Sequence, residues 1–228
     1  MSTMMIIGGT EGLGRFLAQR HADRGGAVVV AGRDAGRAEA VAKEIGPAAT
    51  GLGLDLARPE TIAGSVSGVP SLDHLVITAG HQRPNTLRDF DIAEATTAVT
   101  IKLVGYAEAV RVLRERFTPE ASVVLFGGLA KERPYPGSTV VTTVNGAVTG
   151  LVKTLAVEIA PHRVNALHPG LVGDSPRWRD ADLGQVTDRT PTGRLVTMEE
   201  VADATDFLLR NGGMNGHDLF IDGGFLTR

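Results

Sequence analysis

The sequence Met4-Met-Ile-Ile-Gly-Gly-Thr-Glu-Gly-Leu-Gly14 runs from a short apolar segment directly into a glycine-rich loop. We expect a buried strand over Met4–Ile7, a tight turn at Gly8, and close approach of the backbone to a bound phosphate at Gly12 and Gly14. A helix that begins in this loop directs its N–H groups at an anion. The stretch therefore predicts a nucleotide-binding unit, although an isolated glycine motif can also be a plain strand-to-helix turn.

Strand and helix signals alternate along the rest of the chain. Short apolar runs predict strands buried on both faces at Ala27–Ala31, Gly51–Asp55, His74–Ile77, Ser122–Phe126, Val164–Leu167 and Leu219–Ile221. Helical patterns separate them, with Asp34 as a candidate N-cap and Thr197-Met-Glu-Glu200 as a capping box. This order predicts an α/β fold, a three-layer Rossmann-like doubly wound parallel sheet of about seven strands, with its ligand at the carboxyl ends of the strands.

The composition limits the functions to consider. With 228 residues and 43% hydrophobic content, the chain is expected to form a single domain over residues 1–228. A net charge of −3 offers no basic field for nucleic acid, and the absence of cysteine excludes disulfides, thiolate catalysis and zinc–thiolate sites. No signal peptide or membrane-spanning run is visible. We expect a cytoplasmic protein that binds a small molecule, without a metal site and without nucleic acid or a membrane as partner.

The end of the second predicted strand, Val30-Ala-Gly-Arg-Asp34, bears on the choice of nucleotide. A carboxylate at this strand tip favours a ribose 2′-hydroxyl, whereas the planar cation of Arg33 suits a 2′-phosphate. This favours NADP(H) over NAD(H). Glu11 argues against it, because a carboxylate beside the phosphates does not help to bind another anion. Arg33 could also be a solvated turn residue, with Asp34 only capping a helix.

Further motifs follow the predicted strands: Asp55-Leu56, Thr78-Ala79-Gly80, Pro169-Gly170, Asn215-Gly216 and Asp222-Gly223-Gly224. Together with the glycine loop, they make the chain resemble the short-chain dehydrogenase/reductases over essentially its full length. Thr78 stands where this family usually has asparagine. The resemblance implies that the nucleotide is bound by Gly8, Thr10, Glu11, Gly12, Leu13, Gly14, Arg33, Asp55, Leu56, Thr78, Ala79, Gly80, Pro169, Gly170, Leu171 and Val172, with Asp55 and Leu56 at the adenine, Ala79 and Gly80 at the nicotinamide ribose, and the last four at the nicotinamide.

The same resemblance implies a catalytic serine, tyrosine and lysine, usually with a helix asparagine. In this family the tyrosine donates a proton, the lysine lowers the pKa of the tyrosine and holds the ribose, and the serine orients the substrate carbonyl. In this chain the serine position falls on Gly128, the tyrosine position on Val141, the lysine position on Asn145 and the asparagine position on Lys102. All four residues are replaced.

Lysine and asparagine have thus exchanged places. We hypothesise that Lys102 occupies the space of the usual lysine and contacts Asn145, the ribose or the substrate, because a desolvated lysine can titrate low enough to transfer protons. The alternative is that Lys102 reaches solvent from an ordinary helix face. Tyr135 is a poor substitute for the missing tyrosine, because Thr139 rather than lysine follows four residues later and prolines flank it.

Other polar residues near the predicted strand ends are weaker candidates. His81, His168, Asp174 and Ser175 could each donate a proton or simply be bonded within loops. Lys131 and Arg133 could meet an anionic substrate or form a solvated rim. The segment Leu171–Thr190 is a candidate substrate lid, in which Trp178 either shields the nicotinamide or packs the lid itself.

One predicted helix bears on assembly. The stretch Ser138–Ala160 carries apolar residues on more than one face, which is typical of a helix covered on several sides. The family resemblance implies contacts through this helix and through Asp89–Phe117. We therefore expect a homodimer or homotetramer with two-fold symmetry.

Three classes of function remain open. The first, which we favour, is an NADP(H)-dependent oxidoreductase that acts on a small carbonyl or alcohol with a non-standard proton donor. The second is a non-redox enzyme, such as an isomerase, cyclase or lyase, on the same scaffold. The third is a catalytically inactive regulatory protein that binds the cofactor or a metabolite.

Overall fold

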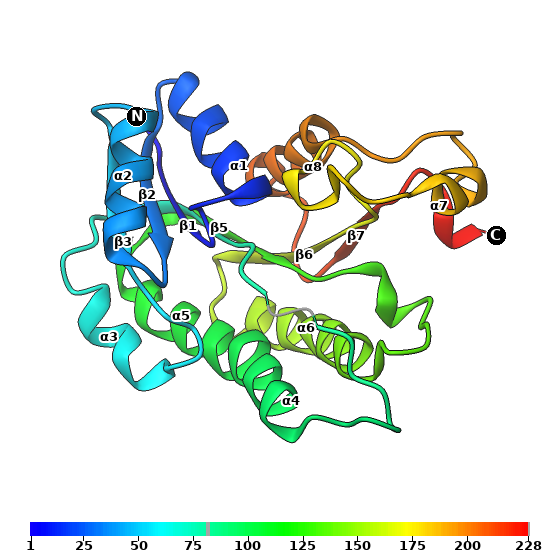
Figure 1. Ribbon diagram of the computed structural model, residues 1–228. Coiled ribbons are helices and arrows are strands. Elements are labelled where there is room, and N and C mark those ends of the chain that lie inside the picture. Colours follow the sequence, from blue (N-terminus) through cyan, green and yellow to red (C-terminus); the bar gives the residue numbers. More distant parts are fainter. Residues whose placement is uncertain (81–82, 228) are drawn as a thin grey trace.

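A seven-stranded parallel sheet lies between two layers of helices in the computed structural model, which describes residues 1–80 and 83–227 (Figure 1). The strands are β1 (Thr3–Ile7), β2 (Ala27–Gly32), β3 (Ala49–Gly53), β4 (Leu72–Ile77), β5 (Phe117–Phe126), β6 (Arg163–Pro169) and β7 (Asp218–Ile221). Their spatial order is β3-β2-β1-β4-β5-β6-β7, with every neighbouring pair parallel. The predicted doubly wound α/β fold and all of its predicted strands are confirmed.

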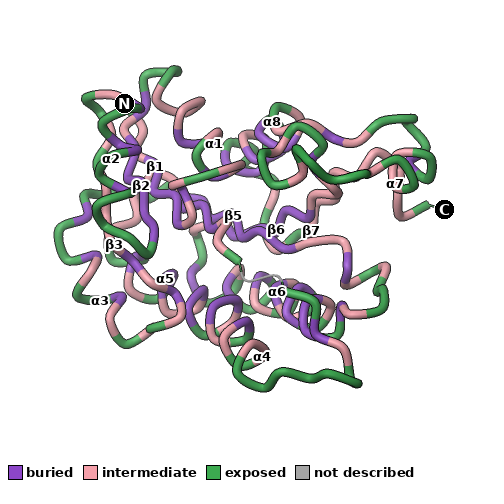
Figure 2. Tube along the Cα trace, viewed as in Figure 1, coloured by how far each residue is buried: buried purple, intermediate pink, exposed green. Residues whose placement is uncertain are grey.

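Successive side chains along each strand point to opposite faces of the sheet, so the buried residues form two clusters, one on each face. Met4 and Ile6 face the cluster that includes α1 (Gly12–Asp23), α2 (Ala35–Ile45) and α8 (Met198–Arg210). Met5 and Ile7 face the other cluster, with α3 (Ile62–Ser65), α5 (Tyr106–Leu113) and α6 (Thr139–Glu158). Figure 2 shows the buried strands between the two helical layers. The order of the strands reverses between β1 and β4, where such folds bind their ligands.

Local sequence signals fix several element ends. The Asp34 side chain caps α2 by accepting a hydrogen bond from the Arg37 amide at 2.9 Å, and Thr197 and Glu200 form the predicted capping box of α8. The prediction of a strand over Gly51–Asp55 was two residues too long at its end. Asp55 instead folds back to accept a hydrogen bond from the Ala57 amide at 3.0 Å, which turns the chain after β3.

The helix expected from Asp89 to Phe117 is interrupted. It consists of α4 (Ile92–Val99), a π-helical segment at Thr100–Gly105 and α5, and Phe117 already belongs to β5. Gly105 is packed so closely that a Cβ atom there would overlap the carbonyl oxygen of Leu56. π-Helical turns of this kind occur often at functional sites.

The long helix α6 is two residues shorter at its C-terminal end than predicted. Seven of its residues, among them Val144, Val148 and Val152, are buried, whereas Gly146, Gly150 and Val157 are exposed. Within one chain α6 packs against the sheet and against α4, and its remaining side is exposed. The sequence-based prediction expects a second subunit to cover that side. By length and composition α6 could cross a membrane, but its buried residues pack it onto the sheet as a core helix.

Candidate functional site

The glycine loop lies between the carboxyl end of β1 and the start of α1, as the sequence predicts. A Cβ atom at Gly8, where φ is +95°, would lie 2.7 Å from the Ala79 amide nitrogen, and one at Gly14 would overlap the carbonyl oxygen of Gly8. Gly12, where φ is +50°, has no atom within 4 Å of its Cβ position. The loop is therefore tightly packed underneath and open above Gly12. This shape, at the N-terminal end of a helix, fits the pyrophosphate of a dinucleotide.

The ends of β2 and β4 adjoin this loop. Thr10 packs against Gly32 at the end of β2, where a Cβ atom would lie 2.7 Å from the Thr10 Cγ2 atom. On the other side, the Thr78 hydroxyl donates to the carbonyl oxygen of Gly8 at 3.2 Å, and the Ala79 amide donates to that of Ile7 at 3.2 Å. Thr78 therefore ties the loop to β4 from the position where the family usually has asparagine.

The remaining residues expected to bind a nucleotide follow other strands of the sheet. Leu13 is partly buried against the core, and Leu56 is fully inside it at 3% exposure, so its side chain serves packing. At the far side, the Gly170 amide donates to the Ile221 carbonyl oxygen at 2.8 Å, and Val172 forms a bridge with Val196. The segment after Pro169, at the end of β6, is therefore held by β7 on one side and by the chain at Val196 on the other. Leu171 lies within this segment.

Charged residues surround the loop on the β2 side. Arg33 follows β2 and is exposed. Glu11 lies just before Gly12, where a lone carboxylate would disfavour a bound phosphate. Its charge is offset, because its Oε2 atom pairs with the guanidinium of Arg37 at 2.8 Å.

Lys102 points inward from the π-helical segment and is only 2% exposed. Its ammonium donates to the carbonyl oxygen of Phe126 at the end of β5. A Cβ atom at Gly80 would lie 3.3 Å from Cε and 3.7 Å from Nζ, so the end of the lysine side chain packs close to the Gly80 backbone. Burial lowers the pKa of Lys102 to about 7. The alternative in which Lys102 reaches solvent was wrong.

Tyr106 is a site residue that the sequence analysis missed. It lies one helical turn after Lys102, and the Lys102 Nζ atom is 5.1 Å from the centroid of its ring. The phenol is fully buried and donates to the Ala79 carbonyl oxygen at 2.6 Å, and burial raises its pKa far above the usual value. The signal was the spacing Lys102-x-x-x-Tyr106, the reverse of the family's tyrosine–lysine order. Because its proton is held by a backbone acceptor, Tyr106 is a structural partner rather than an acid.

Asn145 projects from α6 and is buried, at 1% exposure. Its Nδ2 atom would lie 3.0 Å from a Cβ atom at Gly128, so the amide fills the space that a serine side chain would need there. Its Oδ1 atom has no hydrogen-bond partner within residues 1–80 and 83–227, and no hydrogen bond joins it to Lys102 in that part of the chain. Val141, one turn earlier, is a buried core residue.

His168 is held by the backbone on one side and by an acid on the other. Its Nδ1 atom accepts from the Gly128 amide at 3.1 Å, and its Nε2 atom lies 3.2 Å from Asp218 Oδ1. Burial lowers the pKa of this histidine, so it stays neutral. Asp218 Oδ2 also accepts from Lys131 Nζ at 2.9 Å and from the Thr149 hydroxyl at 2.7 Å. His168 therefore supports the loop after β5 through Nδ1, whereas its Nε2 atom makes no hydrogen bond within the described residues although it lies close to Asp218.

The other weaker candidates are also engaged. Arg133 donates to the Phe225 carbonyl oxygen at 2.8 Å, and Asp174 accepts from the Met198 amide at 2.8 Å. Tyr135 lies in a loop, 58% exposed, as expected. Trp178 is half-buried beside Arg177 and ends a short 3-10 turn that Ser175 precedes, whereas His81 lies outside the described residues.

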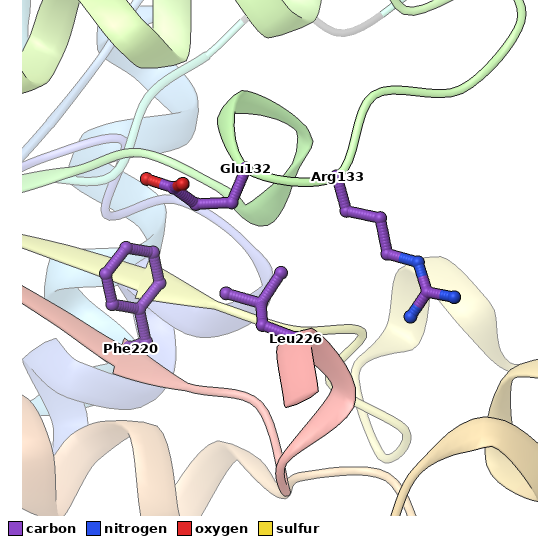
Figure 3. A pocket seen from close by; sticks show the side chains of 4 residues that line it. All are labelled: Glu132, Arg133, Phe220 and Leu226. Atoms are coloured by element: carbon purple, nitrogen blue, oxygen red, sulfur yellow. The ribbon is translucent and has the colours of Figure 1, made fainter. Parts of the chain in front are cut away.

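A pocket of about 580 Å³ opens between the loop after β5 and the C-terminal segment (Figure 3). Its labelled side chains are Glu132 and Arg133 from the loop, Phe220 from β7 and Leu226 from the C-terminal turn. It lies at the β7 edge of the sheet, away from the glycine loop. Two cations of this loop are engaged with the C-terminal part of the chain: Lys131 pairs with Asp218 on β7, and Arg133 donates to the Phe225 carbonyl oxygen. Neither of these contacts involves Lys102.

Comparison with known proteins gives consistent matches over the full length. A sequence family described as Enoyl-(Acyl carrier protein) reductase matches residues 8–226. The chain is 28% identical to the short-chain reductase protein NovJ of Streptomyces niveus, covering 98% of this chain and 93% of that protein. Two solved structures each superpose with a TM-score of 0.90 and cover 100% of this chain and 96% of theirs: the MalC reductase/Diels-Alderase of Malbranchea aurantiaca, 26% identical, and a gluconate 5-dehydrogenase of Burkholderia cenocepacia in complex with NADP and tartrate, 25% identical.

Proposed function

Since the chain belongs to the short-chain dehydrogenase/reductase family, we propose that it is an NADP(H)-dependent oxidoreductase of a small carbonyl or alcohol, with Lys102 as proton donor. The observation that carries the proposal is the buried amine of Lys102, with a pKa of about 7, packed beside Gly80 at the position expected next to the nicotinamide ribose. The named reductases and dehydrogenases among its relatives support redox chemistry for the family.

The residues present fit a nicotinamide dinucleotide. The open backbone at Gly12 suits the pyrophosphate, and Arg33 at the end of β2 suits a 2′-phosphate. The complex of the gluconate 5-dehydrogenase with NADP supports the same preference. When bound, such a cofactor supplies hydride to the substrate carbon or accepts it.

The chain's own task is then to handle one proton. The Lys102 ammonium gives its proton to the carbonyl oxygen during reduction, and the neutral amine accepts the proton of the alcohol during oxidation. A pKa of about 7 suits both directions, because neither form is scarce near neutral pH. The Phe126 carbonyl oxygen and the ring of Tyr106 hold Nζ in place.

Asn145 is proposed as the second polar group of the site. Its Oδ1 atom is a buried acceptor without a hydrogen-bond partner among the described residues, and such an atom is costly unless a ligand or water donates to it. A hydroxyl group of the ribose or of the substrate can supply that donor. The asparagine would thus fix a hydroxyl by accepting a hydrogen bond, where the family's lysine donates one.

The test measures nucleotide binding and turnover separately. NADPH titration by fluorescence is followed by a panel of small aldehydes and ketones, with turnover read from the loss of nicotinamide absorbance. We expect Lys102→Met to abolish most turnover while NADPH affinity stays within a few-fold, and the matched surface variant Lys43→Met to behave as wild type. Unchanged turnover in Lys102→Met would show that the lysine is not the proton donor.

A second candidate function is a non-redox reaction, such as a cyclisation, in the same pocket. Two observations favour it: the tyrosine position is Val141, and one structural neighbour is named a reductase and Diels-Alderase. This function predicts product formation from a suitable substrate without any change in nicotinamide absorbance.

We also propose that the protein is a cytoplasmic homodimer or homotetramer. Apolar side chains remain exposed on the helices that the family resemblance assigns to assembly, with Ile92 73%, Val104 52% and Val157 78% exposed. A second copy would cover them. A monomeric mass by light scattering at micromolar concentration would contradict this proposal.

A further inference from the structure

An ion pair connects the glycine loop to the second helix. Glu11 Oε2 lies 2.8 Å from the guanidinium of Arg37, and both side chains are more than half exposed. Glu11 is the N-cap residue of α1, yet its side chain makes no capping hydrogen bond. Arg37 belongs to the first turn of α2, where Asp34 holds its amide. The pair therefore spans the space beside the carboxyl ends of β1 and β2.

A third charge belongs to the same region. Arg33 immediately follows β2, and it forms no ion pair within residues 1–80 and 83–227. The contact between Thr10 and Gly32 shows that the glycine loop and the end of β2 touch. In dinucleotide-binding folds the adenosine ribose lies at the end of this strand. Two carboxylates and two guanidinium groups thus belong to the segments around the place where NADP(H) and NAD(H) differ, and one of the carboxylates, Asp34, is engaged as the cap of α2.

We propose that the pair of Glu11 and Arg37 sets the coenzyme preference by ion exchange. In the nucleotide-free protein, Arg37 is held by Glu11. The 2′-phosphate of NADP(H), a phosphomonoester with roughly −1.5 to −2 charges near pH 7, displaces the carboxylate and takes Arg37 as a second cation beside Arg33. This inference rests on the proposed NADP(H) site and adds the residues that adjust its selectivity.

The exchange is favourable for a phosphate and not for a hydroxyl. An exposed carboxylate–guanidinium pair is weak, so it can open at little cost, and a phosphate offers more charge and more acceptor oxygens than a carboxylate. NAD(H) carries a neutral 2′-hydroxyl and leaves the pair closed. Glu11 therefore lowers the affinity for NADP(H) below what the two arginines alone would give.

The charges can be changed one at a time. Glu11→Gln leaves both cations for the phosphate, whereas Arg37→Met removes one cation and leaves the Glu11 carboxylate without its partner. A matched control is Glu44→Gln. Glu44 pairs with Arg15 at 2.5 Å and also joins α1 to α2.

The experiment is a titration of wild type and the three variants with NADPH and with NADH, read as dissociation constants by calorimetry. We expect Glu11→Gln to tighten NADPH binding about threefold to tenfold and Arg37→Met to weaken it by a similar factor. NADH binding should change less than about twofold in both, and Glu44→Gln should change neither nucleotide. Added salt should reduce the difference between Glu11→Gln and wild type.

The outcomes separate two failures. A wild-type protein that binds neither nucleotide contradicts the proposed function, and the ion exchange with it. A wild type that binds NADPH, with variants that leave the ratio of NADPH to NADH affinity unchanged, overturns the ion exchange alone. Equal effects of Glu11→Gln and Glu44→Gln would likewise overturn it, because they would show a general effect of net charge.

Discussion

The ammonium of Lys102 and the phenol of Tyr106 face the same acceptor, the carbonyl oxygen of Phe126, with Nζ 5.1 Å from the centroid of the tyrosine ring. The chain thus contains a lysine–tyrosine pair four residues apart, but on a different helix and in reverse order from that of its family. The phenol also donates to Ala79 at 2.6 Å, which leaves the amine as the group of the pair that can exchange a proton.

The pH dependence of turnover should follow Lys102. With a pKa of about 7, the ammonium is lost as the pH rises, so kcat/KM for carbonyl reduction should fall above about pH 7 and that for alcohol oxidation should fall below it. Lys102→Arg keeps the charge but not the proton exchange, so it should retain little activity and lose this profile. A wild-type profile in the arginine variant would contradict the assignment.

The same burial should make stability depend on pH in the alkaline range. The pKa of Lys102 is lowered from 10.5 to about 7, so between these values the unfolded chain binds more protons than the folded one. The free energy of unfolding should therefore rise with pH from about 7 to 10.5 through this group. Urea unfolding at several pH values should show that Lys102→Met lacks this rise, whereas Lys43→Met keeps it.

His74 should make the free energy of unfolding depend on pH in the acidic range. Its pKa is lowered from 6.5 to about 4, mainly by burial, and its Nδ1 atom lies 2.9 Å from the Ser122 hydroxyl. As the pH falls, the unfolded chain protonates His74 before the folded chain does. The free energy of unfolding therefore decreases through this group as the pH falls from about 6.5 toward 4. Thermal unfolding of His74→Gln should show a smaller decrease across this range than wild type. Parallel curves would exclude His74 as the cause.

The glycine loop should not tolerate a methyl group at Gly14. A Cβ atom there would overlap the Gly8 carbonyl oxygen, so Gly14→Ala should cost about 1–3 kcal/mol of stability and weaken nucleotide binding at least tenfold. Gly64→Ala, in α3 with no atom within 4 Å of the new Cβ, is the control and should be neutral or stabilising by up to about 1 kcal/mol. Differential scanning fluorimetry and NADPH titration measure the two effects.

Gly128 and Asn145 should behave as a coupled pair. A Cβ atom at Gly128 would lie 3.0 Å from the Asn145 Nδ2 atom, so Gly128→Ser forces the buried amide to move. The single variant should lose about 1–2 kcal/mol, and Asn145→Ala in the same chain should recover part of that loss. Additive effects in this double-mutant cycle would show that the two positions do not share the space.

The sequence was a good guide to the sheet and a poor guide to polar contacts. Strands such as β1 and β4 are buried on both faces, so continuous apolar runs predict them. The end of β3 was missed because Asp55 turns the chain with its own side chain, which no apolar pattern encodes. The π-helical segment was missed because its residue types also suit an ordinary helix.

The candidate site shows the same division. The loop glycines were predicted because backbone packing requires them, and the inward position of Lys102 was anticipated from the exchange with Asn145. The partner of Lys102 was not, because its acceptor is a main-chain carbonyl of Phe126, and main-chain carbonyls are common to all residues. The pairing of Glu11 with Arg37 depends on how α1 packs beside α2, which is tertiary information.

The contact of His168 with Asp218 has a consequence for biosynthesis. The glycine loop contacts β1, β2 and the end of β4, which the ribosome makes early. The backbone at Gly128 is held by His168, and His168 faces a carboxylate on β7, the last strand of the sheet. The last strand to be synthesised therefore completes the wall of the site opposite the nucleotide loop, so the two walls are completed at different times during synthesis.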